Sequence, residues 1–444
     1  MTDPRVALGA GTMSAMQVAA VAVTIGLNAL DGFDVLSISF ASPGIARDWG
    51  IDRAALGVVL SMELIGMGLG SMLLGGVADR VGRRRTLLGC LGVMSLGMLM
   101  ASRAAGVVDL SIWRVVTGLG IGGMLATINA VAAEFSSDAR RSLNVSLMVI
   151  GYPIGAVIGG SIAAVLLQQG DWRVVFEFGA AATAAFIPLV WFLVPESVVW
   201  LCQRQPAGAL DKVNRSLARM GRQPIDCLPS RGADAARRSA ADIFGPRLIR
   251  VTALLTLAYF LHITTFYFLL KWVPKIVVDM GFTPASAAGV LVWANVGGAS
   301  GGAVLGLLSL RFGLKPLTVC VLVLSTFMVT LFGHGQADLA QLSLVCAATG
   351  FCTNAAVVGL YGLLAQAYPT YLRATGTGFA VGTGRAGAML APIIAGSLFH
   401  GGYGLQFVAI AMSVGSLVAA AAVGLLPHNA RPHAAVFDGI MGRT

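Results

Sequence analysis

The chain has 444 residues, of which 57% are hydrophobic and only 11% are charged, and its formal net charge is +10. Soluble globular proteins carry about 25% charged residues, so this composition excludes an ordinary soluble domain and indicates an integral membrane protein. The 57 glycines follow no three-residue period, which excludes a collagen-like fibre.

Twelve apolar runs are long enough to cross a bilayer, because a membrane helix needs about 20 predominantly apolar residues. Six of them precede a polar stretch, at 18–42, 54–78, 86–106, 109–134, 143–168 and 173–195. The other six follow it, at 248–272, 284–309, 316–333, 339–367, 374–399 and 404–426. The sequence therefore predicts an all-α membrane protein with twelve transmembrane helices in two six-helix halves, 1–196 and 248–427.

The polar stretch between the halves, 197–247, is predicted to be a linker with a short surface helix around 206–220. It is rich in arginine, and further basic residues fall in alternate loops between the predicted spans. Positive residues concentrate on the cytoplasmic side of membrane proteins. We therefore expect a cell (inner) membrane protein whose linker, tail (428–444) and two termini are cytoplasmic, and whose positive charge reports orientation in the lipid bilayer rather than binding to nucleic acid.

Patterns typical of other chemistries are missing from the sequence. The six cysteines are scattered without a CxxC pair, so neither a metal site nor a disulfide framework is expected. The chain contains no P-loop lysine motif and no Ser-His-Asp arrangement outside the predicted spans. We expect no enzymatic activity, no metal, no cofactor, and a monomer.

The two halves resemble one another in sequence. With an offset of 232, Thr117 and Gly118 fall on Thr349 and Gly350, Arg141 falls on Arg373, and Gly155 falls on Gly387. Each match is weak alone, but together they indicate two parallel six-helix repeats. Transporters built this way bind substrate near the midplane between their halves and alternate access by rocking one half against the other.

Several segments carry a resemblance to known transporters. "GGVADRVGRRRT" (75–86), "RVVTGLGIGG" (114–123), "GYPIGAVIGG" (151–160) and "PES" (195–197) resemble motifs of the major facilitator superfamily. "DGFD" (31–34) and "YLRATGTGFAVGTGRAG" (371–387) resemble the aromatic acid:H⁺ symporter family. This resemblance implies a transporter that carries an aromatic carboxylate together with protons.

Asp31 and Asp34 lie three residues apart in the first predicted span, so they share one helix face. A charge at the centre of a bilayer costs about 2.5–3.5 kcal/mol on insertion scales. Two neighbouring carboxylates in a low dielectric repel each other, which favours a shared proton and hence a role in proton coupling. The alternative is that one Asp is permanently paired with an arginine. Glu63, in the second span, replaces or extends this pair at a position where the family generally has a small residue.

Arg385 is predicted near the middle of the eleventh span, among the small residues of "GTGRAGAM" (382–389). A guanidinium there can hold a substrate carboxylate through two parallel hydrogen bonds. The alternative is a salt bridge to a membrane acid such as Asp34. Arg114 is a second candidate for the substrate and a candidate partner of the first-helix aspartates. Lys271 is expected to snorkel at the outer end of its helix, and the alternative is that it attracts anions at the entrance.

Aromatic, histidine and amide side chains are expected to complete the substrate site. They are Phe33, Tyr152, His262, Phe266, Tyr267, Asn295, Asn354 and Tyr361. Aromatic rings can hold an aryl group by stacking. A purely structural role is the alternative for His262, and bridging between helices is the alternative for the asparagines. The aryl part of this prediction follows from the family resemblance, and the carboxylate part follows from arginine chemistry.

Charged residues at the predicted inner ends of the spans are expected to form a cytoplasmic gate that holds the halves together in the outward-open form. They are Asp79, Arg80, Arg83, Arg84, Glu134, Arg141 and Arg373. Asp79 is also expected to cap the start of a helix.

The sequence therefore predicts a proton-coupled importer of a small aromatic or related organic carboxylate. One alternative is an exporter that exchanges protons for an amphipathic compound. An alternative of another class is a non-transporting membrane sensor for aromatic acids, although such a sensor is expected to add a sizeable partner-binding domain.

Overall fold

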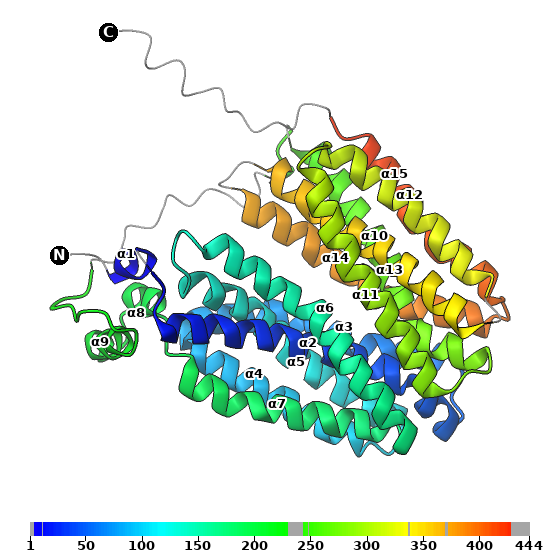
Figure 1. Ribbon diagram of the computed structural model, residues 1–444, viewed down its shortest axis with the longest axis horizontal. Helices are drawn as coiled ribbons and strands as arrows, with labels where there is room; N and C mark the ends of the chain where they lie inside the picture. Colours follow the sequence, from blue (N-terminus) through cyan, green and yellow to red (C-terminus); the bar gives the residue numbers. More distant parts are fainter. Residues whose placement is uncertain are drawn as a thin grey trace, which may run out of the picture. The chain divides into compact units, whose positions relative to one another are not determined.

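The computed structural model describes residues 4–10, 12–229, 243–246, 248–335, 338–368 and 372–427. Over these residues it is built from helices without strands (Figure 1). Twelve of the described helices are long and apolar enough to span a membrane. The prediction of twelve spans and an all-α fold is confirmed, whereas the predicted tail, 428–444, lies outside the described residues.

The helix bounds follow the predicted spans closely. The first six spans are α2 (Ala15–Trp49), α3 (Arg53–Val81), α4 (Arg83–Ser102), α5 (Val107–Glu134), α6 (Arg141–Gln169) and α7 (Arg173–Leu193). The second six are α10 (Ile249–Asp279), α11 (Pro284–Ser309), α12 (Leu314–Gly333), α13 (Leu339–Ala367), α14 (Arg373–His400) and α15 (Leu405–Gly424). Three short helices are α1 (Pro4–Gly9), α8 (Val198–Arg204) and α9 (Ala209–Arg219), of which α9 is the predicted surface helix of the linker.

Polar side chains fix where several spans begin. Ser14 and Gln17 form a reciprocal capping box at the start of α2, with N–O distances of 3.3 and 3.0 Å. The Asp52 carboxylate accepts a hydrogen bond from Ala55 N at 2.7 Å at the start of α3. Asp338 caps α13 in the same way. These caps satisfy backbone N–H groups that have no partner within the helix.

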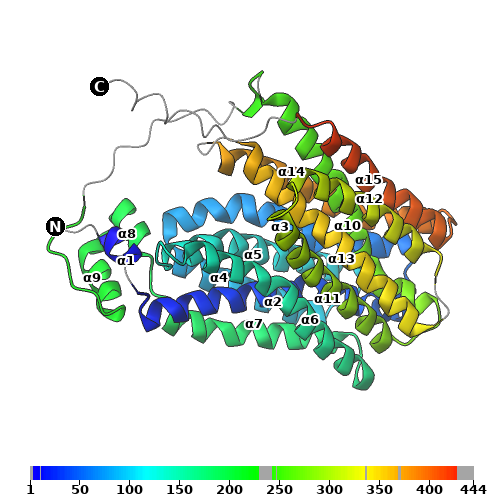
Figure 2. The same ribbon diagram turned by 45° about the horizontal axis from the view of Figure 1, so that its top comes forward.

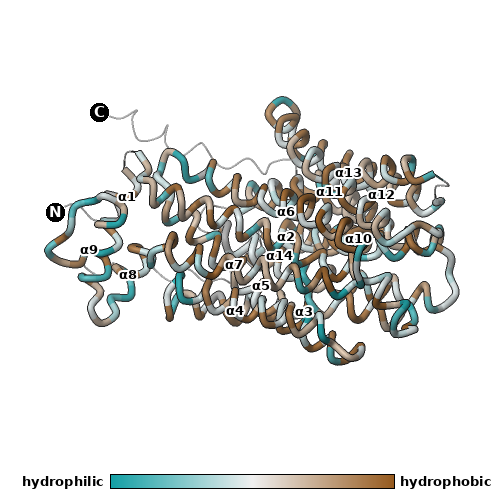
Figure 3. The backbone as a smooth tube through the Cα atoms, turned by 60° about the horizontal axis from the view of Figure 1, so that its bottom comes forward, coloured by the Kyte–Doolittle hydropathy of each residue, from teal (hydrophilic) through white to brown (hydrophobic). Residues whose placement is uncertain are grey.

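Hydropathy separates the spans from the linker helices. The long helices are predominantly hydrophobic along their length, whereas hydrophilic residues gather in α9 and in the turns (Figure 3). This distribution places the α2–α7 and α10–α15 helices in a bilayer and leaves α9 outside it.

The described chain divides into two compact units that do not follow the two halves of the sequence residue by residue. Of the described residues, those within 4–229, 270–296 and 392–402 belong to the first unit, and those within 243–269, 297–391 and 403–427 belong to the second. The first unit therefore includes the C-terminal end of α10, the first half of α11 and the C-terminal end of α14. The predicted boundaries of the halves, the linker and the tail stay predictions.

Within the first unit, α2 packs against α6 and α7, and α5 packs between α3 and α4 (Figures 1 and 2). The approach of α5 to α3 is close at Gly118, where a Cβ atom would lie 2.2 Å from the main-chain oxygen of Glu63. Membrane helices approach this closely through small residues. The contact brings the residue one turn earlier on α5, Arg114, alongside Glu63.

The end of α10 that belongs to the first unit is held both to α3 and to the end of α14. Arg53 of α3 forms a 3.0 Å ion pair with Asp279 at the end of α10. Trp272 is buried and donates a hydrogen bond from Nε1 to Pro392 O of α14 at 3.3 Å. The C-terminal end of α10 is thereby anchored beside the residues of α2 and α3 that carry the candidate site.

Candidate proton and substrate site

The two aspartates of α2 are enclosed by protein. Every residue from 30 to 43 is buried, and the side chains of Asp31 and Asp34 are fully buried. Asp34 Oδ2 accepts a hydrogen bond from Thr183 Oγ1 of α7 at 3.4 Å. Asp34 Oδ1 is buried and accepts no hydrogen bond from any residue that the structure describes. One oxygen of this carboxyl group is therefore available to carry a proton.

Glu63 of α3 and Arg114 of α5 form an ion pair with an Oε2–Nη2 distance of 2.5 Å, and both side chains are fully buried. Arg114 also donates to the main-chain oxygen of Asp34 at 3.1 Å and to the Met98 sulfur at 3.0 Å. Its guanidinium lies 5.3 Å from the centre of the Phe176 ring. Arg114 thus reaches Asp34 through the main chain and takes its charge partner from α3.

Lys271 of α10 does not snorkel, and that prediction is wrong. Its side chain is fully buried, and Nζ lies 3.4 Å from Glu63 Oε2. Nζ also donates a hydrogen bond to the main-chain oxygen of Val35. A buried ammonium requires a nearby anion and hydrogen-bond acceptors, and Glu63 and the α2 backbone supply both.

These five residues, Asp31, Asp34, Glu63, Arg114 and Lys271, form what we call the buried charge cluster. All five have 0% exposure. The cluster contains three carboxylates and two cations, so its formal charge is −1 when every group is ionised. A net charge away from water is costly, and binding of one proton makes the cluster neutral.

The second unit contributes Arg385, which follows Gly384 on α14. A Cβ atom at Gly384 would lie 2.2 Å from Cδ1 of Tyr259, so the glycine allows the Tyr259 ring of α10 to lie directly against α14. Tyr259 OH donates to Tyr361 OH of α13 at 3.0 Å, and Arg385 interacts electrostatically with Tyr259. Tyr361 is 42% exposed. A guanidinium, a buried phenol (Tyr259) and an exposed phenol (Tyr361) therefore occupy the same region of this unit.

Other predicted substrate residues are engaged within their own units. His262 is fully buried, with Nδ1 2.9 Å from Ser416 Oγ and Nε2 2.9 Å from Thr353 O, which agrees with the structural alternative. Asn354 donates to Gly298 O of α11 at 2.7 Å and so bridges two helices. Asn295 donates to Leu291 O of its own helix at 2.8 Å.

Of the predicted aromatic residues, Phe33 is buried and packs edge-on against Phe178, with ring centres 5.3 Å apart. Its ring therefore belongs to the interior of the first unit. Phe266 and Tyr267 are half-buried neighbours on α10, also in edge-on contact. Tyr152 is half-buried on α6, at the contact with α2.

The predicted gate residues of the first unit form two separate groups. Arg83 pairs with Asp79 at 2.6 Å and with Glu134 at 3.3 Å. Arg141 pairs with Asp138 at 2.7 Å. Arg80 is exposed, and Arg373 begins α14 in the second unit. A latch between the halves stays a prediction.

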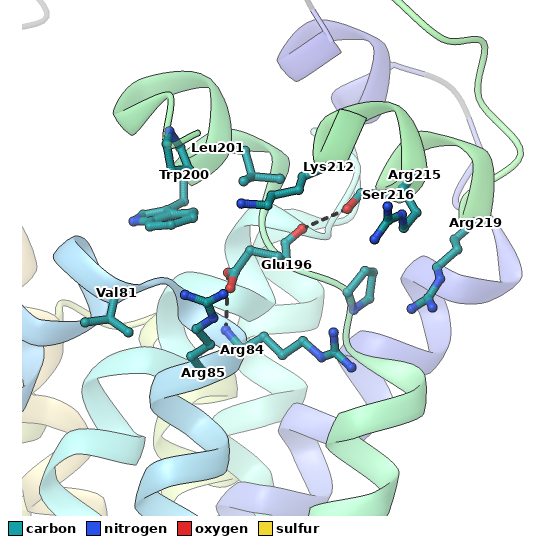
Figure 4. A pocket seen from close by; sticks show the side chains of 12 residues that line it. Val81, Arg84, Arg85, Glu196, Trp200, Leu201, Lys212, Arg215, Ser216 and Arg219 are labelled. Carbon is teal, nitrogen blue, oxygen red and sulfur yellow. Dashed lines mark hydrogen bonds between the residues drawn. The ribbon is translucent and has the colours of Figure 1, made fainter. Parts of the chain in front are cut away.

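Asp79 does not cap a helix, and that prediction is wrong because it lies inside the last turn of α3. The start of α4 is capped instead by Glu196, whose Oε1 accepts hydrogen bonds from Arg83 N at 2.8 Å and Arg84 N at 3.2 Å. The bond from Arg84 is drawn in Figure 4. Burial raises the pKa of the Glu196 carboxyl above its ordinary value.

Sequence reasoning missed Tyr259, Glu196 and the true environment of Lys271. The "PES" segment contained Glu196, but its contact with α4 spans more than 110 residues of sequence. A usable signal for Lys271 was the buried acid Glu63, which needs cations nearby. No signal of comparable strength pointed to Tyr259.

Comparison with known proteins agrees with this architecture. A family model described as the Major Facilitator Superfamily matches residues 24–332 and 255–440. The chain is 32% identical over 412 residues to a 3-(3-hydroxy-phenyl)propionate transporter of Escherichia coli (strain K12), covering 91% of this chain and 93% of that protein. It is 30% identical to a gallate transporter of Pseudomonas putida, with 88% of each chain covered.

The fold is also that of a solved transporter. The crystal structure of a D-xylose-proton symporter matches with a TM-score of 0.71 at 18% identity, covering 91% of this chain and 97% of the other. Family model, relatives and fold agree over nearly the full described length. The chain is a multi-pass membrane protein that belongs to the Major Facilitator Superfamily.

Proposed function

We propose that this protein is a secondary transporter that imports a small aromatic carboxylate together with protons by alternating access. It works as a monomer in the cell (inner) membrane, with both termini in the cytoplasm. It uses the proton as coupling ion and needs no cofactor, and it carries out transport rather than an enzymatic reaction.

The buried charge cluster is the observation that carries the proposal. The cluster contains three carboxylates and two cations whose side chains are all fully buried, so it is neutral only after it has taken up one proton. Asp34 is the proposed proton carrier because one of its oxygens accepts no hydrogen bond from the described residues. Glu63 is occupied by Arg114 and Lys271, so its proposed role is to balance these cations.

The second unit supports the choice of substrate class. Arg385 can hold a carboxylate through paired, charge-assisted hydrogen bonds, and the hydroxyl groups of Tyr259 and Tyr361 offer partners for a ring hydroxyl. The relatives named above are transporters of gallate and of 3-(3-hydroxy-phenyl)propionate, which are both hydroxylated aromatic acids. We assign the same substrate class to this chain.

The proposed transport cycle follows from the charges of Asp34, Arg385 and the substrate acid. In the outward-open form, Asp34 takes up a proton and the acid binds to Arg385. Protonation makes the buried charge cluster neutral, and the bound acid brings a negative charge next to the Arg385 guanidinium. Both changes lower the cost of enclosing the site. Opening to the cytoplasm lets water reach the site, where the proton and the acid leave.

Uptake into proteoliposomes with an imposed pH gradient, alkaline inside, tests the proposal. The acids to supply are gallate, 3-(3-hydroxyphenyl)propionate, 4-hydroxybenzoate and benzoate. Wild type is compared with Asp34→Asn and Arg385→Gln, and with the controls Asp226→Asn and Arg103→Gln at exposed positions.

Gradient-driven accumulation of one acid by wild type and both controls, but by neither site variant, supports symport. Expulsion of an amphipathic compound under the reversed gradient, without uptake of any acid, supports the exporter instead. Binding of an acid without transport in either direction supports the sensor.

A further inference from the structure

A cavity of about 270 Å³ lies beside the first unit's spans, where the α3–α4 turn, the end of α7, α8 and α9 meet (Figure 4). Small-molecule sites occupy roughly 300–1,000 Å³, so this cavity suits a headgroup-sized ligand. Buried Trp200 and Leu201 of α8 form part of its wall, and the buried Ser216 lies on α9. None of the residues assigned to proton or substrate binding lines it.

The cavity is strongly basic. Its lining includes five cationic residues and a single acid; the cations are Arg84, Arg85, Lys212, Arg215 and Arg219. The acid, Glu196, is already bound to the backbone N–H groups at the start of α4. Arg84 and Arg219 repel each other electrostatically. The cavity therefore holds an excess of positive charge that its own residues do not balance.

Several donors of this lining have no acceptor among the residues that the structure describes. Within the described part of the chain, no hydrogen bond or ion pair involves the guanidinium groups of Arg85, Arg215 or Arg219. Arg84 donates from Nη2 to Trp191 O at 2.5 Å, but its buried Nε–H has no acceptor among the described residues. Arginine forks directed at one space match the oxygen geometry of a phosphate group.

The neighbouring surface of α7 is suited to lipid. Trp191 is 54% exposed and Phe192 is 68% exposed, and they lie a few residues before Pro195 and Glu196 of the cavity wall. Arg84 joins the two regions because its guanidinium also lies 4.8 Å from the centre of the Trp191 ring. An acyl chain can thus run along α7 while its phosphate enters the cavity.

We propose that this cavity binds the phosphate group of an anionic phospholipid in the cytoplasmic leaflet. The phosphate bridges the start of α4 to α9, and so fastens the linker helix to the first unit by removing the repulsion between their arginines. The basic loops place this end of the spans on the cytoplasmic side, and the proposal does not depend on which substrate is transported.

The test variant carries Arg215→Gln and Arg219→Gln, two exposed positions on α9. The control variant carries Arg250→Gln and Arg311→Gln, which remove the same charge at exposed positions on the same predicted side of the membrane. Full-length proteins are reconstituted into nanodiscs of phosphatidylethanolamine with or without phosphatidylglycerol and are then released from them. Native mass spectrometry counts the lipids retained. Thermal unfolding is measured with added phosphatidylglycerol, inorganic phosphate or glycerol 3-phosphate, and monodisperse elution verifies that each variant is folded.

We expect wild type and the Arg250/Arg311 variant to retain phosphatidylglycerol and to be stabilised by it, and the α9 variant to retain at least fivefold less. Arg85→Gln, on the opposite wall, should show the same loss. Equal retention by all variants overturns the proposal. If inorganic phosphate or glycerol 3-phosphate stabilises the protein as much as phosphatidylglycerol does, the proposed lipid ligand is wrong and the cavity binds a soluble phosphate.

Discussion

Glu63 Oε2 and Arg114 Nη2 lie 2.5 Å apart, and neither side chain is exposed. Because of this ion pair, the carboxylates of the buried charge cluster have different roles. Glu63 balances Arg114 and Lys271, whereas the Asp34 carboxyl accepts a hydrogen bond from the Thr183 hydroxyl and forms no ion pair with any residue that the structure describes. A carboxyl group outside these two ion pairs is better placed than Glu63 to gain and lose a proton.

Replacing Glu63 by Gln is expected to destabilise the protein by about 3 kcal/mol, because removal of one member of a buried ion pair leaves the other charge uncompensated. Lys271→Met should be milder, since the Nζ–Oε2 distance is 3.4 Å. Thermal unfolding of the purified protein measures both. The double variant should lose less stability than the sum of the single changes, and strict additivity would show that the two groups do not interact.

Asp34→Asn is expected to abolish accumulation of the acid against its gradient while leaving exchange of internal for external acid intact. The amide cannot release a proton, so the pH gradient no longer drives the cycle, whereas exchange needs no proton release. Parallel uptake and counterflow assays in proteoliposomes separate these activities. If Asp31→Asn shows this pattern and Asp34→Asn behaves as wild type, the proton carrier is Asp31 instead.

Arg385→Lys is expected to raise KM for the acid by roughly 10-fold to 100-fold, since a lysine keeps the charge but cannot form two parallel hydrogen bonds with a carboxylate. The maximal rate should change less. Concentration-dependent uptake gives both values. An unchanged KM would mean that Arg385 does not bind the substrate carboxylate.

Tyr361→Phe is expected to weaken discrimination between 4-hydroxybenzoate and benzoate by about fivefold, the effect of one hydrogen bond of about 1 kcal/mol. Its hydroxyl is bonded to that of Tyr259, so Tyr259→Phe should act in the same direction. Competition between the two acids measures the ratio of their kcat/KM values. Tyr403→Phe, in a stacked pair with Phe407 on α15, is the matched control and should leave the ratio unchanged.

The Glu196 cap makes stability depend on pH. Burial raises its pKa above the ordinary value of 4.5, so the folded protein binds this proton more tightly than the unfolded chain does. The stability that this adds is complete below about pH 4.5 and is lost as pH rises through the folded pKa. Glu196→Gln keeps an acceptor for the start of α4 but cannot titrate.

Unfolding temperatures of wild type and Glu196→Gln between pH 4.5 and 8 measure this effect. Relative to the variant, wild type should lose stability as pH rises. A difference that is constant across this range would mean that Glu196 has the same pKa in the folded and unfolded chain.

The sequence by itself determined the number and length of the spans, the linker helix and the candidate acids and bases. Hydropathy and the helical repeat are local properties, so a run such as 173–195 predicts α7 (Arg173–Leu193) without knowledge of its neighbours. The presence of Asp34 and Arg385 inside apolar runs was visible for the same reason.

Only the tertiary structure decided which charges meet. Glu63 and Lys271 are 208 residues apart, yet their atoms lie 3.4 Å from each other. Lys271 was expected to reach the membrane surface because a single helix shows how far along the span a residue lies, but not which helix packs against it. Close packing at Gly118 and the inclusion of the C-terminal end of α10 in the first unit set these pairings, since burial of a charge is tolerated only where the fold supplies an opposite one.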